Sequence, residues 1–177
     1  MATIYTIGHS TRSLQELIEA LQAHAIGVLA DIRAFPMSSR LPWFNRESLE
    51  RELPRAGIAY IWIPALGGRR KKQMERSPNL GLRNNSFRNY ADYMLSRSFR
   101  AGIAEVLELA TRNIAIMCAE RVYFHCHRML VADWLAAHGH TVLHMDAGGP
   151  ARAHRLTAEA VLQGDDVVYP ESSSSIK

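Results

Sequence analysis

The sequence predicts a single α/β domain, with a mostly parallel, doubly wound sheet of about five strands flanked by helices. Short β-prone apolar runs recur along the chain, and segments with helical spacing of apolar residues separate them. Strands that alternate with amphipathic helices favour parallel crossover connections. The 177 residues fit one hydrophobic core. We expect the domain to cover residues 1–170 and the serine-rich residues 171–177 to form a flexible tail.

Five runs are predicted as strands. They cover residues 2–7, 27–32, 58–63, 114–117 and 141–145. Gly8 ends the first run and Pro64 ends the third. The fourth run is continuously apolar, which is typical of a parallel strand covered on both faces.

The helices are predicted from capping signals and apolar spacing. A capping-box pattern, Ser13 to Glu16, starts the first helix. A short helix follows Asn45 and is expected to end at Pro54 and Gly57. Further helices are predicted around residues 87–95 and 99–110, and over residues 127–138 before a glycine cap.

The composition indicates a soluble, cytoplasmic protein. The first ten residues, MATIYTIGHS, lack a cationic leader with a long apolar run, and no apolar stretch approaches the ~20 residues that cross a bilayer. Two cysteines are too few for a secreted disulfide scaffold. We predict no cofactor and no membrane partner, and the sequence does not indicate the oligomeric state.

Positive charge is concentrated in one segment. Residues 66–100 carry nine basic and two acidic residues, a formal charge of +7, whereas the rest of the chain sums to −3 within a total of +4. Such asymmetry suits a polyanionic partner such as nucleic acid, although a solvated loop and helix face would look the same. Trp43 and Phe44, in a loop beside Pro42, are candidates for a ligand contact.

Reactive residues and glycines cluster where the predicted strands end. In open parallel sheets, ligands bind beyond the carboxyl ends of the strands. The residues expected there are Gly8, His9 and Ser10; Asp31 and Arg33; Gly67, Gly68, Arg69 and Arg70; Cys118 and Glu120; Cys126, His127 and Arg128; and His144 and Asp146.

Six ordered motifs resemble the bacterial and archaeal family called domain of unknown function 488. They are TIGHSTRS, DIR with the nearby PMSSR ending at Arg40, GIAY, LGGRR, CAE and CHR. The likeness runs from Thr6 to about Tyr169 and implies an α/β fold, with a map of site residues rather than a reaction. The loop between Cys118 and Cys126 departs from relatives, which usually carry acidic or proline residues there.

Three kinds of chemistry fit the cysteine-rich stretch MCAERVYFHCHR. A metal site is disfavoured because consecutive His125, Cys126 and His127 cannot all face one point, although Cys118, Cys126 and His9 could converge. A thiol nucleophile at Cys126 would gain from a helix N-terminus and nearby cations. However, the residue six positions after each cysteine is not the arginine of phosphatase and sulfurtransferase loops, and no C-x-x-C motif is present.

Anion capture is the third kind of chemistry. The first turn of the helix near His127 offers free N–H groups, and an arginine side chain presents a fork suited to phosphate. The expected ligand-binding residues are Gly8, Ser10, Arg33, Arg40, Gly67, Gly68, Arg69, Arg70, Cys118, His127 and Arg128. Glu120, Asp31, His9 and Cys126 are the expected catalytic residues, with ion pairing to arginine as the structural alternative for each carboxylate.

These observations favour an enzyme that acts on a phosphate-bearing ligand, either a nucleic acid or a nucleotide, at the carboxyl edge of the sheet. Two alternatives stay open. One is a non-catalytic module that binds nucleic acid or protein through residues 69–100. The other is a thiol-dependent enzyme for a small molecule, which would use Cys126.

Overall fold

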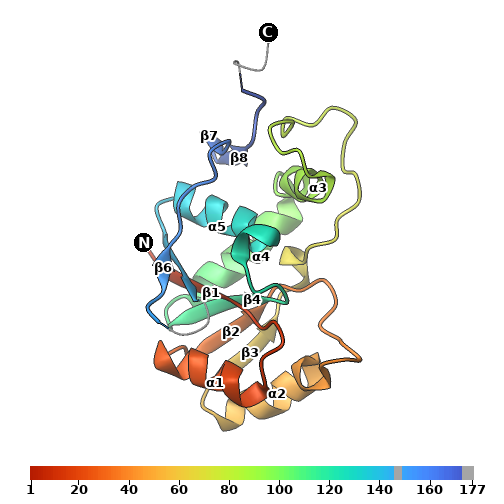
Figure 1. Ribbon diagram of the computed structural model, residues 1–177. Coiled ribbons are helices and arrows are strands. Elements are labelled where there is room, and N and C mark those ends of the chain that lie inside the picture. The colour runs from red at the N-terminus through yellow and green to blue at the C-terminus, as the bar shows by residue number, and fades with distance from the viewer. Residues whose placement is uncertain (146–148, 173–177) are drawn as a thin grey trace.

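The computed structural model describes residues 1–145 and 149–172 and confirms the α/β class (Figure 1). One six-stranded sheet has the order β3-β2-β4-β1-β5-β6. The bounds are Thr3–Gly8 for β1, Val28–Asp31 for β2, Ala59–Trp62 for β3, Ile114–Cys118 for β4, Thr141–Met145 for β5 and Arg152–Ala153 for β6. The first five strands are parallel, and β6 is antiparallel to β5.

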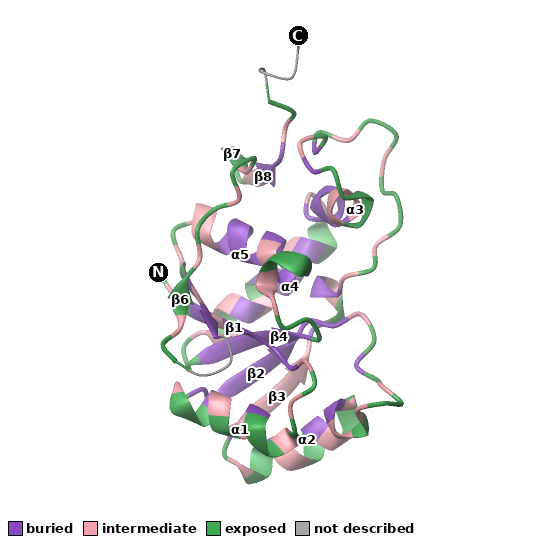
Figure 2. Cartoon of the chain, viewed as in Figure 1, coloured by how far each residue is buried: buried purple, intermediate pink, exposed green. Residues whose placement is uncertain are grey.

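Helices cover both faces of the sheet, as the doubly wound class requires. The helices α1 (Leu14–Ala23) and α2 (Arg46–Arg55) lie below the sheet in Figure 1, whereas α3 (Asn85–Tyr93), α4 (Arg97–Leu109) and α5 (Arg128–Ala137) lie above it. Each face has its own apolar core. Strand β4 is buried along its whole length (Figure 2), which matches its continuously apolar sequence.

The capping box at the start of α1 forms as predicted. The Glu16 backbone N–H donates to the Ser13 hydroxyl, and the Ser13 N–H donates to the Glu16 carboxylate, both at 3.0 Å. Three short 3-10 helices lie in the connections: η1 (Pro42–Phe44), η2 (Pro64–Leu66) and η3 (Tyr123–His125).

The structure differs from the prediction in the number of strands. The sheet has six strands, because the exposed two-residue segment β6 pairs with β5 and is too short to show an alternating pattern. A separate hairpin of β7 (Val161–Gln163) and β8 (Asp166–Val168) follows. Helix α2 ends at Arg55, between Pro54 and Gly57 as predicted, and Gly57 follows the C-cap residue Ala56 with a positive φ of 78°. The predicted tail at 171–177 lies mostly outside the described residues.

The parallel register brings the carboxyl ends of four strands to nearly one level. Gly8 of β1 pairs with Cys118 of β4, and Asp31 of β2 pairs with Met117 of β4 and Trp62 of β3. The loops that leave these strands therefore meet at one edge. Within residues 1–145 and 149–172, no helix is long and apolar enough to cross a bilayer.

Candidate active site at the carboxyl edge

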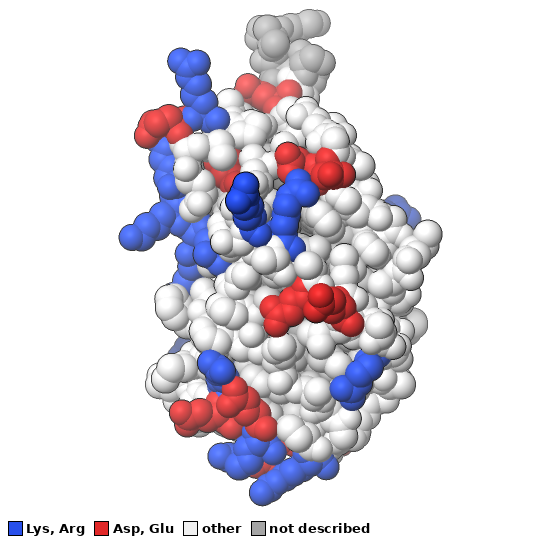
Figure 3. Space-filling view, turned by 180° about the vertical axis from the view of Figure 1, so that it is seen from behind, with Lys and Arg blue, Asp and Glu red and all other residues white. Residues whose placement is uncertain are grey.

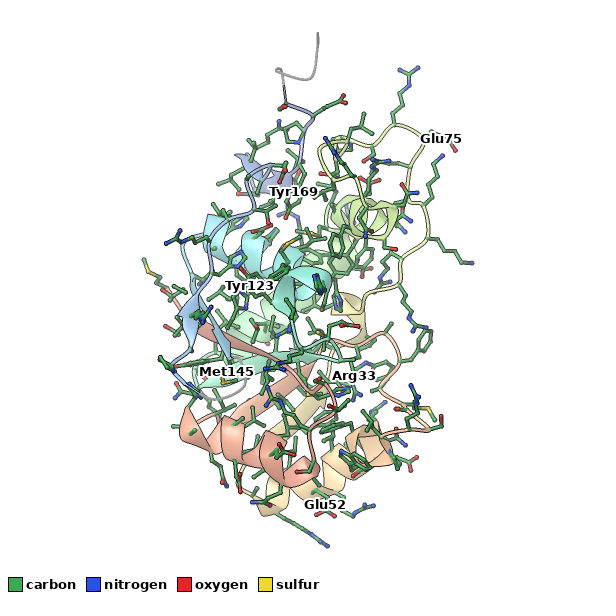
Figure 4. The ribbon with its side chains drawn as sticks, in the orientation of Figure 1. Arg33, Glu52, Glu75, Tyr123, Met145 and Tyr169 are labelled. Atoms are coloured by element: carbon green, nitrogen blue, oxygen red, sulfur yellow. The ribbon has the colours of Figure 1, made fainter. Side chains whose placement is uncertain are left out.

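A cavity of about 440 Å³ opens at the carboxyl ends of β2 and β4. Its size lies within the roughly 300–1,000 Å³ of small-molecule sites. Arg33, labelled in Figure 4 beside the strand ends, contributes to its wall. The lining also includes Ala34, Phe35, Met37, Gly68, Arg69, Ser86, Phe87, Tyr90, Cys118, Ala119, Glu120, His125, Cys126 and His127. Seven of the predicted site residues are therefore brought together around one space.

The two cysteines meet in the wall of this cavity. Cys118 ends β4 and Cys126 directly follows η3, and their sulfur atoms lie 2.7 Å apart. Both are free and buried. Burial alone would raise the pKa of Cys126, but a hydrogen bond from the Cys118 thiol, the His127 ring and the charge of Arg128 hold it well below its ordinary value. Burial and the same hydrogen bond raise the pKa of Cys118 well above its ordinary value.

His127 is oriented toward the Cys126 sulfur. Its Nε2 lies 2.8 Å from the Ile32 carbonyl oxygen, which can only accept, so Nε2 carries the hydrogen. In the neutral ring, Nδ1 is then a free acceptor 3.6 Å from Cys126 Sγ, so it can take the thiol proton, and the imidazolium so formed donates to the thiolate. The Arg128 backbone N–H also donates to this sulfur over 3.3 Å. The sulfur therefore has a base beside it and an N–H donor at the start of α5.

The Arg128 side chain points into the protein and not into the cavity. It is 1% exposed, and its guanidinium donates to Thr6 Oγ1 (3.1 Å) and to the carbonyl oxygens of Glu120 (2.7 Å) and Arg121 (3.1 Å). The phosphate fork predicted for Arg128 does not fit this position. None of these partners is a carboxylate, so a thiolate at Cys126 would balance the charge of the guanidinium.

Asp31 is paired with Arg33, which was the structural alternative for this carboxylate. Both are buried, and the guanidinium binds the carboxylate through Nε (2.9 Å) and Nη2 (2.6 Å). The Tyr60 hydroxyl adds a hydrogen bond of 2.6 Å. Burial, followed by the Asp31 charge, raises the pKa of Tyr60, so this hydroxyl stays a donor. Asp31 positions the arginine at the cavity wall and does not itself reach the cavity.

His9 and its neighbours lie behind the cavity. His9 Nδ1 donates to the Ser10 carbonyl oxygen (2.9 Å), which leaves Nε2 as the acceptor that faces Arg33 Nη1 at 3.3 Å. Burial lowers the pKa of His9 to about 4, so the ring is neutral at physiological pH. It stacks on Phe44, with ring centres 4.3 Å apart. A Cβ on Gly8 would lie 1.7 Å from the Glu120 carbonyl oxygen, so this position requires glycine.

The loop after η2 divides into structural and cavity-facing residues. A Cβ on Gly68 would lie 2.9 Å from the His127 ring, so Gly68 lets this loop approach the base. Arg69 is exposed and lines the cavity, with its guanidinium 5.7 Å from the Phe35 ring centre. Arg70 instead donates to the Gly67 and Pro64 carbonyl oxygens and covers the Tyr93 ring. The remaining predicted arginine, Arg40, is exposed and is not among the lining residues.

The two candidate carboxylates do not face one another. Glu120 is exposed at the cavity wall, while Asp31 is buried behind it. Trp43 and Phe44, expected at a ligand, are instead packed: Trp43 Nε1 donates to the Arg12 carbonyl oxygen (2.9 Å), and Phe44 is fully buried.

Sequence reasoning missed the apolar side of the cavity. Phe35 and Met37 are 66% and 76% exposed at its wall, and Phe87 and Tyr90 line it from α3. The sequence offered one signal of it, since Phe35 and Met37 are apolar residues in an otherwise polar loop directly after a strand. Phe87 and Tyr90 have the spacing of core residues, and Tyr90 is indeed fully buried, so the sequence held no sign of their second role.

No group of three His, Cys, Asp or Glu side chains is arranged to hold a metal ion in the described part of the chain.

His144 lies on β5, where its Nδ1 accepts from the Thr6 hydroxyl over 2.6 Å. Asp146 falls outside the described residues.

These features define an α/β protein with a cavity at the carboxyl edge of a parallel sheet and a cysteine pair in its wall. The chain belongs to the family described as domain of unknown function DUF488, whose model matches residues 13–135. Searches of curated proteins and of solved structures gave no match. The family membership names no reaction, so the site itself must support any functional conclusion.

Proposed function

We propose that this protein is an enzyme that binds a small phosphate-bearing ligand in the cavity and attacks it with the Cys126 thiolate. The observation that carries the proposal is the arrangement of Cys126 Sγ, His127 Nδ1 at 3.6 Å and the Ile32 carbonyl oxygen that orients the ring. A nucleophile, a base and a group that orients the base are the usual components of nucleophilic catalysis.

The charges of the cavity support an anionic ligand. Arg69 contributes an exposed cation to its wall and His125 is exposed beside it, while Arg33 also lines the cavity but is paired with Asp31. Phe35 and Met37 would pack against an apolar or aromatic part of the same ligand, such as a nucleotide base. Glu120 is the only acidic residue among the lining residues and is the candidate to move a proton on the ligand.

In the proposed step, the thiolate forms a bond to an electrophilic atom of the ligand. The bond to the leaving group breaks, and the leaving group departs with the electron pair and takes a proton from the His127 imidazolium or from Glu120. Water then cleaves the sulfur-bound intermediate and returns the thiol to its starting state.

Ligand protection tests this proposal. Inorganic phosphate, nucleoside monophosphates and short oligonucleotides are screened for an increase in Tm and for slower alkylation of Cys126 by iodoacetamide. We expect one of them to do both, and Arg69→Glu to abolish the effect while the exposed Arg55→Glu on α2 does not. A Cys126 that alkylates no faster in the wild type than in His127→Asn would refute the thiolate assignment.

The basic segment supports a second candidate, a nucleic-acid-binding module. Lys and Arg side chains gather along the left edge of Figure 3, over the long connection between η2 and α3. This alternative predicts salt-sensitive oligonucleotide binding that Lys71→Glu with Lys72→Glu abolishes and Cys126→Ser leaves intact. The opposite pattern would favour the enzyme.

A further inference from the structure

We propose that Cys126 and Cys118 act as a dithiol that closes to an intramolecular disulfide, with Cys126 attacking a low-molecular-weight disulfide and Cys118 resolving the product. The inference rests on the proposed function in one respect, since it takes Cys126 as the nucleophile. It adds a redox reaction, with an assigned partner thiol, to that site.

The geometry brings both sulfur atoms to one place. Their separation of 2.7 Å is shorter than a van der Waals contact, and closure to the roughly 2.05 Å of a disulfide needs a shift of less than about 1 Å. Both residues line the cavity, so a small disulfide that enters it reaches Cys126 with Cys118 directly behind. The loop between them holds η3, and the contact between the two sulfur atoms shows that this loop returns to the end of β4.

The surroundings give the two sulfurs different roles. Cys126 has the Arg128 N–H and the His127 ring as partners and is the more exposed of the two, at 6% against 2%. Cys118 Sγ donates toward the Glu120 carbonyl oxygen, 3.6 Å away, and lies 2.7 Å from Cys126 Sγ. These contacts favour a thiolate at Cys126 and a protonated thiol at Cys118, which is the arrangement of an attacking and a resolving thiol.

The reaction balances without any further reagent. The Cys126 thiolate, whose proton is held by His127, attacks RSSR and forms a mixed disulfide, and the departing RS⁻ takes the proton from His127 and leaves as RSH. Cys118 then attacks Cys126 Sγ, which breaks the mixed disulfide, and its proton goes to the second RS⁻, which leaves as a second RSH. The protein loses two electrons and two thiol hydrogens, and RSSR is reduced to two thiols.

Formation of the disulfide would also inactivate the site. A disulfide removes the nucleophile, and it removes the negative charge beside the buried Arg128 guanidinium. The oxidised protein is therefore expected to lack the thiolate activity until a thiol reductant restores it.

The test uses the full-length reduced protein and oxidised glutathione as the probe, with acid quenching, intact mass and peptide mapping. The wild type should lose the mass of two hydrogen atoms and show a Cys118–Cys126 linkage. Cys118→Ser should stop at glutathionylated Cys126 and prolong the mixed disulfide by more than about tenfold, because intramolecular attack is lost. Cys126→Ser should leave Cys118 unreacted.

Other substitutions separate a folding defect from the proposed chemistry. Met117→Leu, at the buried neighbour on β4, should still form the disulfide, and Cys118→Ala should repeat the result of Cys118→Ser. Glutathione that persists on wild-type Cys126 as long as in Cys118→Ser, or first attack at Cys118, would overturn the dithiol. If Cys126 is alkylated rapidly but no disulfide forms, the dithiol is wrong and the proposed function stands. If the disulfide forms although Cys126 is alkylated slowly, the dithiol stands and the thiolate of the proposed function is wrong.

Discussion

Arg128 and Asp133, two buried charges on α5, are the ends of one chain of hydrogen bonds. Arg128 Nη1 donates to Thr6 Oγ1 (3.1 Å), and the chain continues through His144 (2.6 Å) and His154 (2.8 Å) to the Asp133 carboxylate (2.7 Å). A guanidinium only donates and a carboxylate only accepts, so every hydrogen points the same way. This order assigns both tautomers: each histidine accepts at Nδ1 and donates from Nε2.

The chain predicts that stability falls in acid. Burial, followed by the charges of His154 and Arg128, lowers the pKa of His144 to about 3, below the ordinary value of 6.5. As the pH falls below about 6.5, the unfolded chain therefore binds this proton before the folded protein does. The free energy of unfolding should drop by up to about 1.4 kcal/mol per pH unit toward pH 3 from this group, and His9 adds a loss of the same sign.

Urea unfolding between pH 7 and 4.5 measures this effect. His144→Asn should reduce the slope of the unfolding free energy against pH. Val142→Ala, which removes two methyl groups from the core on the same strand, should lower stability but keep the wild-type slope. Equal slopes in the wild type and His144→Asn would contradict the neutral His144.

Replacement of Arg128 should slow the reaction of Cys126. Arg128→Met keeps most of the side-chain volume but removes the buried charge that lowers the pKa of Cys126. The pH profile of iodoacetamide alkylation should shift upward, with a rate at pH 7 lower by about tenfold for each unit of pKa. Arg121→Met, whose side chain is exposed, is the matched control and should keep the wild-type profile. A pH profile that Arg128→Met leaves unchanged would show that Arg128 does not lower the pKa of Cys126.

The Asp31 network should prove structural. Tyr60→Phe removes a 2.6 Å hydrogen bond to a buried carboxylate and should cost about 1.5–3 kcal/mol. Asp31→Asn leaves the Arg33 charge without its partner and should cost about 3–5 kcal/mol. Urea denaturation checks both, with Tyr5→Phe on β1 as the control. If Tyr60→Phe alters Cys126 alkylation without loss of stability, the network acts on the site and not on the fold.

Gly8→Ala should damage the site through the backbone. The added Cβ would lie 1.7 Å from the Glu120 carbonyl oxygen and so push away the segment that follows Cys118. We expect a loss of at least about 3 kcal/mol, the upper part of the range for overpacking. Gly27→Ala is the control, because its nearest neighbour would be 3.4 Å away in a flexible arginine side chain. Comparable unfolding midpoints for the two variants would show that the backbone at Glu120 can move to accept the added Cβ at little cost in stability.

Much of the fold follows from local patterns. The five parallel strands and the helices of both faces were predictable because apolar spacing reports burial directly, and the capping box at Ser13 is a contact between near neighbours. Strand β6 was not predictable, since two exposed residues have no period and pair only because β5 offers a free edge.

The sequence by itself determined which loops meet, because parallel strands place all their carboxyl ends at one edge of the sheet. Only the tertiary structure decided where the side chains beyond those ends point. It turned Arg128 inward to backbone carbonyl oxygens, paired Asp31 with Arg33, and set Cys118 against Cys126. Residue type and spacing cannot predict such contacts, because they depend on how irregular loops from different strands pack against one another.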